Sequence, residues 1–342
     1  MRKDVYDPQI IDTIQQLVSE CDNDASDFAK ELITQMIQNS LKLLQGNHDI
    51  GQLKLISRSM KEMRYAYQVF NHYKNKRCIS IFGSARTPEI HPDYIAAKNF
   101  SAGMSSHGWM CITGAANGIM KAGLEGSKQE SSFGLSIRLP FEVPTNSVIA
   151  GDAKLISFRY FFTRKLMFTS HSDAFAAFPG GFGTLDELFE MLTLQQTGRA
   201  LIVPIVLVEG KEGTYWKHWE EYLDQQLMKN GWTSPADKNL YYIAKTPEEA
   251  VEHIRKFYHC YHSSRYVKDI LVLRLNKTLS QRELGAINLK YKSLVASGEI
   301  AMSPPLPEET DHLDLPRLTF HHTHSDFGLI RALINDINDF SP

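Results

Sequence analysis

Short apolar runs alternate with amphipathic stretches through the middle of the chain, between residues 78 and 208. Each run has the length of a buried strand, and each stretch between runs has apolar residues at helical spacing. The runs are 78–82, 109–113, 133–137, 174–178 and 203–208, and the helical stretches are 93–107, 117–127, 160–170 and 185–197. This alternation predicts an α/β fold of the Rossmann-like type, a parallel sheet with helices on both faces. We assign residues 77–260 to this domain.

Different patterns flank this domain on both sides. Residues 9–74 contain few glycines and have periodic apolar positions, which predicts a helical N-terminal extension over residues 1–76. Beyond residue 260 the pattern predicts a strand over 270–275, a helix over 280–297, a strand over 317–322 and a helix over 326–337. We therefore expect a small α+β appendage over residues 261–342.

Composition and charge serve mainly to exclude classes of protein. The 342 residues carry a net charge of −2, so nothing overall indicates a nucleic-acid or membrane surface. The N-terminus lacks the apolar core of a secretory signal, and no stretch approaches the ~20 apolar residues that span a bilayer. The 4 cysteines are scattered without C-x-x-C spacing. We expect a reduced, cytoplasmic protein without a nucleic-acid or membrane partner.

Glycines and polar residues follow the predicted strands directly. Parallel sheets bind their ligands beyond the carboxyl ends of their strands, so segments at these ends are expected to meet at one edge. The segments are 83–86, 114–118, 138–142 and 180–184. We therefore expect a binding site at this edge of the sheet.

The segment Pro179–Glu187, with the sequence PGGFGTLDE, is the strongest candidate for chemistry. A buried strand precedes it and a helix follows, so free N–H groups and the positive end of the helix dipole make an anion site there. A bound phosphate would raise the pKa of Glu187 and help it to hold or deliver a proton. The alternative is a capping box, with Thr184 as the cap and Glu187 reaching back to it.

Arg164 and Lys165 form a second candidate group. Adjacent basic residues on a helix are usually a solvated pair, which is the simpler interpretation. Their neighbours are dense in apolar side chains, however, so at least one of the two charges is expected at the edge of a buried surface. An arginine in that position needs an anionic or planar partner, which Glu187 or a ligand can supply.

Other motifs are absent or weak. Neither G-x-G-x-x-G nor G-x-x-x-x-G-K-[ST] occurs, which argues against an NAD enzyme and against ATP hydrolysis of the P-loop type. His321, His322 and His324 alternate near the end of the chain, a pattern that is more often surface than metal site. We assign no metal and no cofactor.

With these residues assembled, the chain resembles the LOG ("Lonely Guy") family of nucleotide phosphoribohydrolases, often misnamed lysine decarboxylases. The resemblance covers about residues 77–225 and is closest to the longer bacterial branch. It rests on PGGxGTxxE at 179–187, Arg164-Lys165, Gly83-Ser84, the turn 114–120, Ser172–Phe175, LPFE at 139–142 and LTLQQTG at 192–198.

The resemblance implies hydrolysis of the N-glycosidic bond of a nucleoside 5'-monophosphate, AMP-like and with a cytokinin ribotide as one candidate. The matching positions imply that activity depends on Arg164 and Glu187. They imply phosphate binding by Gly180, Gly181, Gly183 and Thr184, and weaker substrate contacts by Gly83, Ser84, Thr113, Gly114 and Lys165.

The family pattern also implies a homodimer or larger homo-oligomer. One segment departs from it: the common GGGPGIME turn here reads GAANGIMK, over residues 114–121. Ala115 and Ala116 add methyl groups where backbone is expected to approach ligand, and Lys121 replaces a common acid.

Two other functions remain open at this point. A nucleotide-binding or sensing protein without turnover would use the same fold and phosphate turn. Lysine decarboxylation would need pyridoxal phosphate on a lysine, and no lysine in the sequence is marked for that role.

Overall fold

The structure is a computed structural model that describes residues 6–22, 24–139 and 146–340. It divides into two units, Met1–Tyr65 and Ala66–Pro342. Within the described residues, no helix combines the length and apolar character needed to cross a bilayer.

The first unit is helical, as the sequence predicts. It contains α1 (Pro8–Cys21), α2 (Asp27–Lys42) and most of α3 (Ile50–Asn71), which continues into the second unit. Side chains cap the first two helices: Asp7 accepts a hydrogen bond from the Gln9 N–H, and Ser26 accepts one from the Ala29 N–H. These caps satisfy amide groups that the helix itself leaves without acceptors.

A seven-stranded parallel sheet forms the centre of the second unit, in the order β4-β3-β2-β1-β5-β6-β7. The strands are β1 (Cys78–Phe82), β2 (Met110–Thr113), β3 (Ser132–Ile137), β4 (Leu155–Phe158), β5 (Ala174–Ala177), β6 (Ile205–Leu207) and β7 (Tyr242–Ile243). The predicted Rossmann-like α/β fold is confirmed. The edge strands β4 and β7 are not among the predicted strands.

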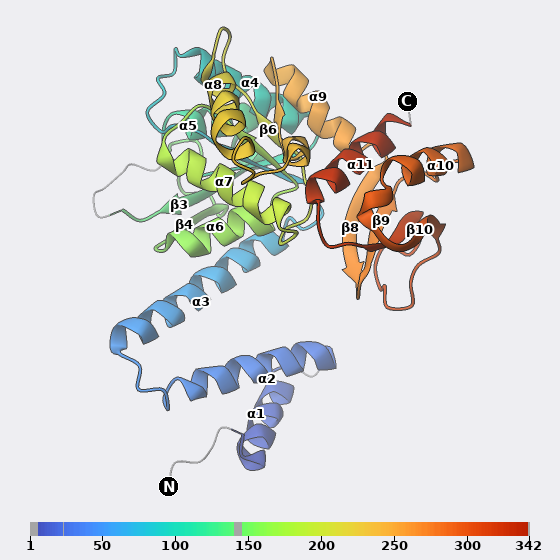
Figure 1. Cartoon of the computed structure of the whole chain (residues 1–342). Helices are drawn as coiled ribbons and strands as arrows, with labels where there is room; N and C mark the ends of the chain where they lie inside the picture. Colours follow the sequence, from blue (N-terminus) through green and yellow to red (C-terminus); the bar gives the residue numbers. More distant parts are fainter. Residues whose placement is uncertain (1–5, 23, 140–145, 341–342) are drawn as a thin grey trace. The chain divides into compact units, whose positions relative to one another are not determined.

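Helices cover both faces of the sheet (Figure 1). Ile79 and Ile81 pack with Phe100 of α4 (Pro92–Ser106) on one face, whereas Phe82 packs against Phe168 of α6 (Phe161–Ser170) on the other. Strand residues therefore alternate between two buried layers. The remaining elements are α4 (Pro92–Ser106), α5 (Ile119–Ser127), η1 (Gln129–Ser131), α6 (Phe161–Ser170), α7 (Phe182–Gln196), α8 (Tyr215–Tyr222), η2 (Leu223–Met228), η3 (Pro235–Leu240) and α9 (Pro247–Phe257).

The direction of winding reverses between β1 and β5, which are neighbours in the sheet. Connections run outward from β1 through β2, β3 and β4, and in the other direction from β5 through β6 and β7. Such a switch point leaves a crevice beyond the carboxyl ends of the two central strands. The turns after β1 and β5 are therefore placed to form a site.

The end of the chain forms a smaller antiparallel sheet in the order β10-β11-β9-β8. Its elements are β8 (Tyr261–Val267), β9 (Ile270–Leu275), α10 (Gln281–Lys290), η4 (Lys292–Leu294), β10 (Val295–Ser303), β11 (Arg317–His322) and α11 (Phe327–Asp339). The predicted helix over 280–297 is wrong at its end, because α10 stops at Lys290 and residues 295–303 form β10. Pairing of β10 with β11 outweighs the local helical pattern.

Candidate functional site

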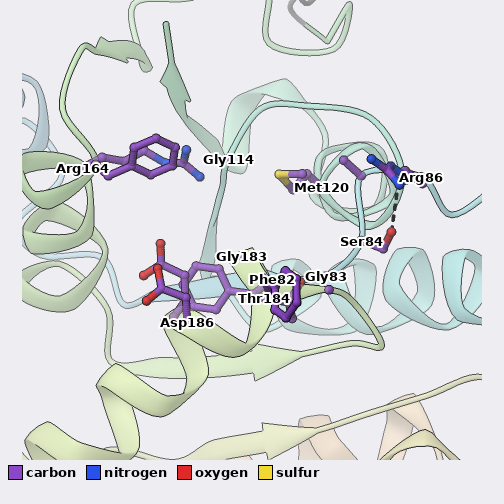
Figure 2. Close-up of a pocket in the computed structure, with 15 residues that line it drawn as sticks. Phe82, Gly83, Ser84, Arg86, Gly114, Met120, Arg164, Gly183, Thr184 and Asp186 are labelled. Atoms are coloured by element: carbon purple, nitrogen blue, oxygen red, sulfur yellow. Dashed lines mark hydrogen bonds between the residues drawn. The ribbon is translucent and has the colours of Figure 1, made fainter. Parts of the chain in front are cut away.

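A cavity of about 470 Å3 opens beyond the carboxyl ends of β1, β2 and β5 (Figure 2). Its walls are the turns after these three strands and the first turns of α6 and α7. In Figure 2, Arg164 and Asp186 lie at one end of the cavity, while Ser84 and Arg86 lie at the other. The predicted site residues that line it are Gly83, Ser84, Gly114, Arg164, Gly181, Gly183, Thr184 and Glu187.

The start of α7 presents unused backbone donors to this cavity. Gly181 is the N-cap, and its carbonyl oxygen accepts hydrogen bonds from the amides of Thr184 and Leu185, at 3.0 and 3.1 Å. The amides of Gly181, Phe182 and Gly183 have no acceptor among the described residues. A Cβ added at Gly181 or Gly183 would meet no atom within 4 Å, so the backbone there lies open to a ligand.

The capping-box alternative is wrong. Thr184 lies inside the first turn of α7, and the helix has no side-chain cap. The Glu187 side chain is therefore not used to close the helix start, which leaves it available to the cavity.

Gly180 has a different task from Gly181 and Gly183. A Cβ at Gly180 would lie 2.1 Å from the Thr184 Oγ1, and the Gly180 carbonyl accepts a 2.7 Å hydrogen bond from the Tyr215 hydroxyl. Gly180 does not line the cavity. Its lack of a side chain allows the turn to close tightly under the helix start.

The turns after β1 and β2 are locked together. The Ser84 carbonyl accepts a 3.0 Å hydrogen bond from the Ile119 N–H. Gly118 has a φ of +61°, and a Cβ there would lie 2.2 Å from the Ser84 carbonyl oxygen. A Cβ at Gly114 would lie 2.9 Å from the Arg164 Nη2. Glycine at position 114 therefore makes room for the guanidinium.

The unusual residues of the second turn point away from the cavity. Ala115 has a φ of +57°, and its side chain is buried with Leu124 and Ile149. Lys121 pairs with Glu89 at 2.5 Å and with Glu125 at 3.7 Å. Neither side chain lines the cavity, so the Ala115 methyl group does not narrow it.

The Arg164 side chain reaches the cavity from the first turn of α6 without a fixed partner. Its guanidinium carbon lies 5.3 Å from the centre of the Phe168 ring, and its buried Nε has no hydrogen-bond acceptor among the described residues. Burial lowers the Arg164 pKa, while the charge of Glu187 acts in the opposite direction. Buried guanidinium groups are normally paired, so this one is available to an anionic ligand.

Glu187 is buried, with only 8% of the residue exposed. Burial raises its pKa to about 7, against the opposing charges of Lys165 and Arg164. The predicted rise therefore needs no bound phosphate. Lys165 lies 3.7 Å from Glu187, outside the cavity lining, and pairs more closely with Asp186 and Glu190 at 3.0 and 2.7 Å. A carboxyl with a pKa near neutrality can donate or accept a proton at working pH.

One predicted site residue, Thr113, lies away from the cavity lining, and one predicted segment is only partly described. Thr113 is buried beneath the second turn, where its hydroxyl accepts a 3.2 Å hydrogen bond from the Ala115 N–H, and it does not line the cavity. In the segment 138–142, residues 140–142 lie outside the described residues.

Sequence reasoning missed Arg86 as a site residue. Its exposed side chain lines the cavity, and its N–H donates a 3.1 Å hydrogen bond to the Ser84 Oγ (Figure 2). The available signal was its place on the same turn as Gly83 and Ser84. Met120, Phe161 and Phe182 add apolar surface to the lining.

Comparison with known proteins identifies relatives of this part of the chain. Residues 106–254 match the family model described as "Possible lysine decarboxylase". Cytokinin riboside 5'-monophosphate phosphoribohydrolase LOG3 of Arabidopsis thaliana is 33% identical over 99 residues, 29% of this chain and 44% of the relative. LOG1 of the same plant is 31% identical over 120 residues, 35% of this chain and 52% of the relative. The resemblance to the LOG family is confirmed, and the matched segments span about half of these relatives.

Solved structures with a similar arrangement have lower sequence identity. The molybdenum cofactor carrier protein from Chlamydomonas reinhardtii is 18% identical, with 53% of this chain and 97% of that chain covered and a TM-score of 0.38. The molybdenum cofactor binding protein from Rippkaea orientalis is 22% identical, with 53% and 96% covered and a TM-score of 0.38. Similarity at this level carries no information about what the chain binds.

Proposed function

We propose that this chain hydrolyses the N-glycosidic bond of a nucleoside 5'-monophosphate and releases the free base and ribose 5-phosphate. One observation carries the proposal: three amides at the start of α7 and the Arg164 Nε, which have no acceptor among the described residues, face the same cavity as a carboxyl with a pKa near 7. The first two suit an anionic substrate, and the third suits proton transfer.

The 5'-phosphate would bind at the start of α7. The free amides of Gly181, Phe182 and Gly183 supply donors there, and the positive end of the helix dipole favours a dianion. Thr184 adds a hydroxyl and Arg86 a positive charge to the same lining. Binding of the phosphate holds the ribose in place for the reaction.

The reaction breaks the bond between C1' and the base nitrogen and forms a bond between C1' and a water oxygen. The base nitrogen takes the electron pair of the broken bond and a proton, while the water loses a proton. Glu187, one helical turn beyond the phosphate site, would stabilise the positive charge that develops on the ribose and accept the proton from water. Arg164 would hold a substrate oxygen close to Glu187.

The finer properties belong to the same proposal. The apolar lining by Met120, Phe161 and Phe182 suits a flat base. The relatives named for cytokinin riboside 5'-monophosphates favour a cytokinin ribotide or AMP as substrate. Phe161 and Phe182 are 56% and 95% exposed, as expected where a second copy completes the site of a homo-oligomer. We expect the protein in the cytoplasm, where its nucleoside monophosphate substrates are formed.

Base release from a panel of nucleotides tests this proposal. Purified protein is incubated with AMP, GMP, CMP, UMP and a cytokinin riboside 5'-monophosphate, and the free base is separated by chromatography. We expect turnover of at least one of them, and a loss of at least ~10²-fold for Glu187→Ala or Arg164→Ala. Exposed Glu221→Ala is the matched control. Saturable binding without any released base would instead identify a non-catalytic nucleotide-binding protein.

A further inference from the structure

A second and larger cavity, of about 810 Å3, lies at the amino ends of the central parallel strands. Cys78, at the amino end of β1, lines it, together with parts of the segments 70–77, 166–175, 199–203 and 258–263. The strands are parallel, so their amino ends lie on the opposite side of the sheet from the carboxyl ends that form the first cavity. The two cavities share no lining residue.

Four positively charged side chains line this second cavity: Lys74, Lys76, Arg77 and Arg199. None of the four takes part in a salt bridge or side-chain hydrogen bond with a described residue. Four unpaired cations around one hollow are therefore a feature that the fold itself does not explain.

The negative charge available to balance them is small. Asp173 is the carboxylate among the lining residues, and it accepts a 2.9 Å hydrogen bond from the Cys78 N–H. Burial raises the pKa of Asp173, while the Cys78 N–H and the charge of Arg77 act in the opposite direction. The cavity thus has a surplus of positive charge, and a concave surface of one sign concentrates the field within it.

Ring contacts hold Arg77 and two histidines in place at this cavity. The Arg77 guanidinium lies over the Tyr258 ring, 3.7 Å from its centre, and the Tyr258 hydroxyl is anchored by a 2.6 Å hydrogen bond to the Asp173 carbonyl. The imidazole rings of His262 and His312 lie 4.6 Å apart at the same cavity. The pKa of His262 is lowered by burial and by the neighbouring charges of His312, Arg77 and Arg274.

An ordinary solvated surface would account for any one of these lysines. It does not account for a half-buried arginine held flat on a tyrosine, together with three unpaired cations around the same hollow. A volume of about 810 Å3 falls within the range of ~300–1,000 Å3 that is usual for small-molecule sites. Arginine and lysine at such a site match the oxygens of phosphate groups.

We propose that this cavity is a second binding site, distinct from the first, for a small molecule that carries several phosphate groups. The surplus of cations over the single carboxylate favours a polyanion over a monophosphate. An occupant would contact Thr169 near the end of α6 and Met191 near the end of α7, which touch each other at 3.6 Å. The first turns of these two helices carry the residues of the first cavity.

Calorimetric titration of the full chain tests the proposal, with ATP, GTP and inorganic tripolyphosphate as probes. The test variant is Lys76→Ala/Arg199→Ala, two exposed residues of the cavity. The control is Lys217→Ala/Lys229→Ala, which removes the same charge from exposed sites elsewhere. Arg164→Ala probes the first cavity separately, and circular dichroism confirms that each variant folds.

We expect saturable binding to the wild type, weakened at least ~10-fold in Lys76→Ala/Arg199→Ala and unchanged in the control and in Arg164→Ala. Equal affinity for tripolyphosphate and the nucleotides would show that the cavity recognises the phosphate groups alone. Tighter binding of the nucleotides would show that it also contacts the base or the ribose. The proposal is overturned if no probe binds at millimolar concentration. It is also overturned if Arg164→Ala abolishes binding while the cavity double variant leaves it intact.

Discussion

The Glu187 carboxyl sits where its charge is disfavoured, and this makes the stability of the protein depend on pH. Its pKa rises from 4.5 to about 7, mainly through burial. The folded state therefore binds a proton at Glu187 more tightly than the unfolded state does. The protonated carboxyl contributes its full stabilisation below pH ~4.5, and this stabilisation is lost as the pH rises through about 7.

Glu187→Gln should therefore stabilise the protein at pH 8 and have little effect near pH 4.5. The shift corresponds to about 3 kcal/mol in the free energy of unfolding at the higher pH, since one pKa unit is worth ~1.4 kcal/mol. Denaturant unfolding of the wild type, Glu187→Gln and the exposed control Glu221→Gln at both pH values measures it. Equal pH dependence in all three proteins would contradict the raised pKa.

At the scale of residues, the sequence pointed to Arg164 and Glu187 but not to every neighbour. Glu187 ends the PGGxGTxxE motif, and Arg164 belongs to the Arg-Lys pair upstream of it. Arg86 has no such context, and only the folded turn brings its side chain to the same cavity. The direction of the Ala115 methyl group was also beyond the sequence, because it depends on a φ of +57° at that position.

At the scale of elements, the glycines at the start of α7 have different roles that the sequence alone does not distinguish. Gly180 is needed for packing, because a Cβ would lie 2.1 Å from the Thr184 Oγ1. At Gly183 a Cβ would meet no atom within 4 Å. The alternative of a capping box is wrong because the helix begins at Phe182 and Thr184 already lies within its first turn.

Gly180→Ala should lower the free energy of unfolding by ~1–3 kcal/mol, as expected for an overpacked position. Gly183→Ala should leave it within ~0.5 kcal/mol of the wild type. Thermal and denaturant unfolding of the two variants, which differ by one methyl group at different places on the same turn, provide the comparison. Equal stability of the two variants would show that the turn is looser than the structure indicates.

At the scale of the whole molecule, the sequence predicted the layers of the fold but not the order of the strands. The periodic pattern does not predict that β1 pairs with β5. This pairing creates the crevice that holds the first cavity. The second cavity was equally hidden, because its lining comes from segments far apart in the chain, between residues 70 and 312. The strand β10 was missed because its pairing with β11, not its own pattern, determines its structure.

The central claim is that the start of α7 holds a phosphate while Glu187 faces the sugar. A crystal structure of the Glu187→Gln variant with AMP tests it most directly. We predict phosphate oxygens ~2.7–3.2 Å from the amide nitrogens of Gly181, Phe182 and Gly183, with the ribose beside residue 187. AMP bound with its phosphate away from these amides, or only in the second cavity, would contradict the account.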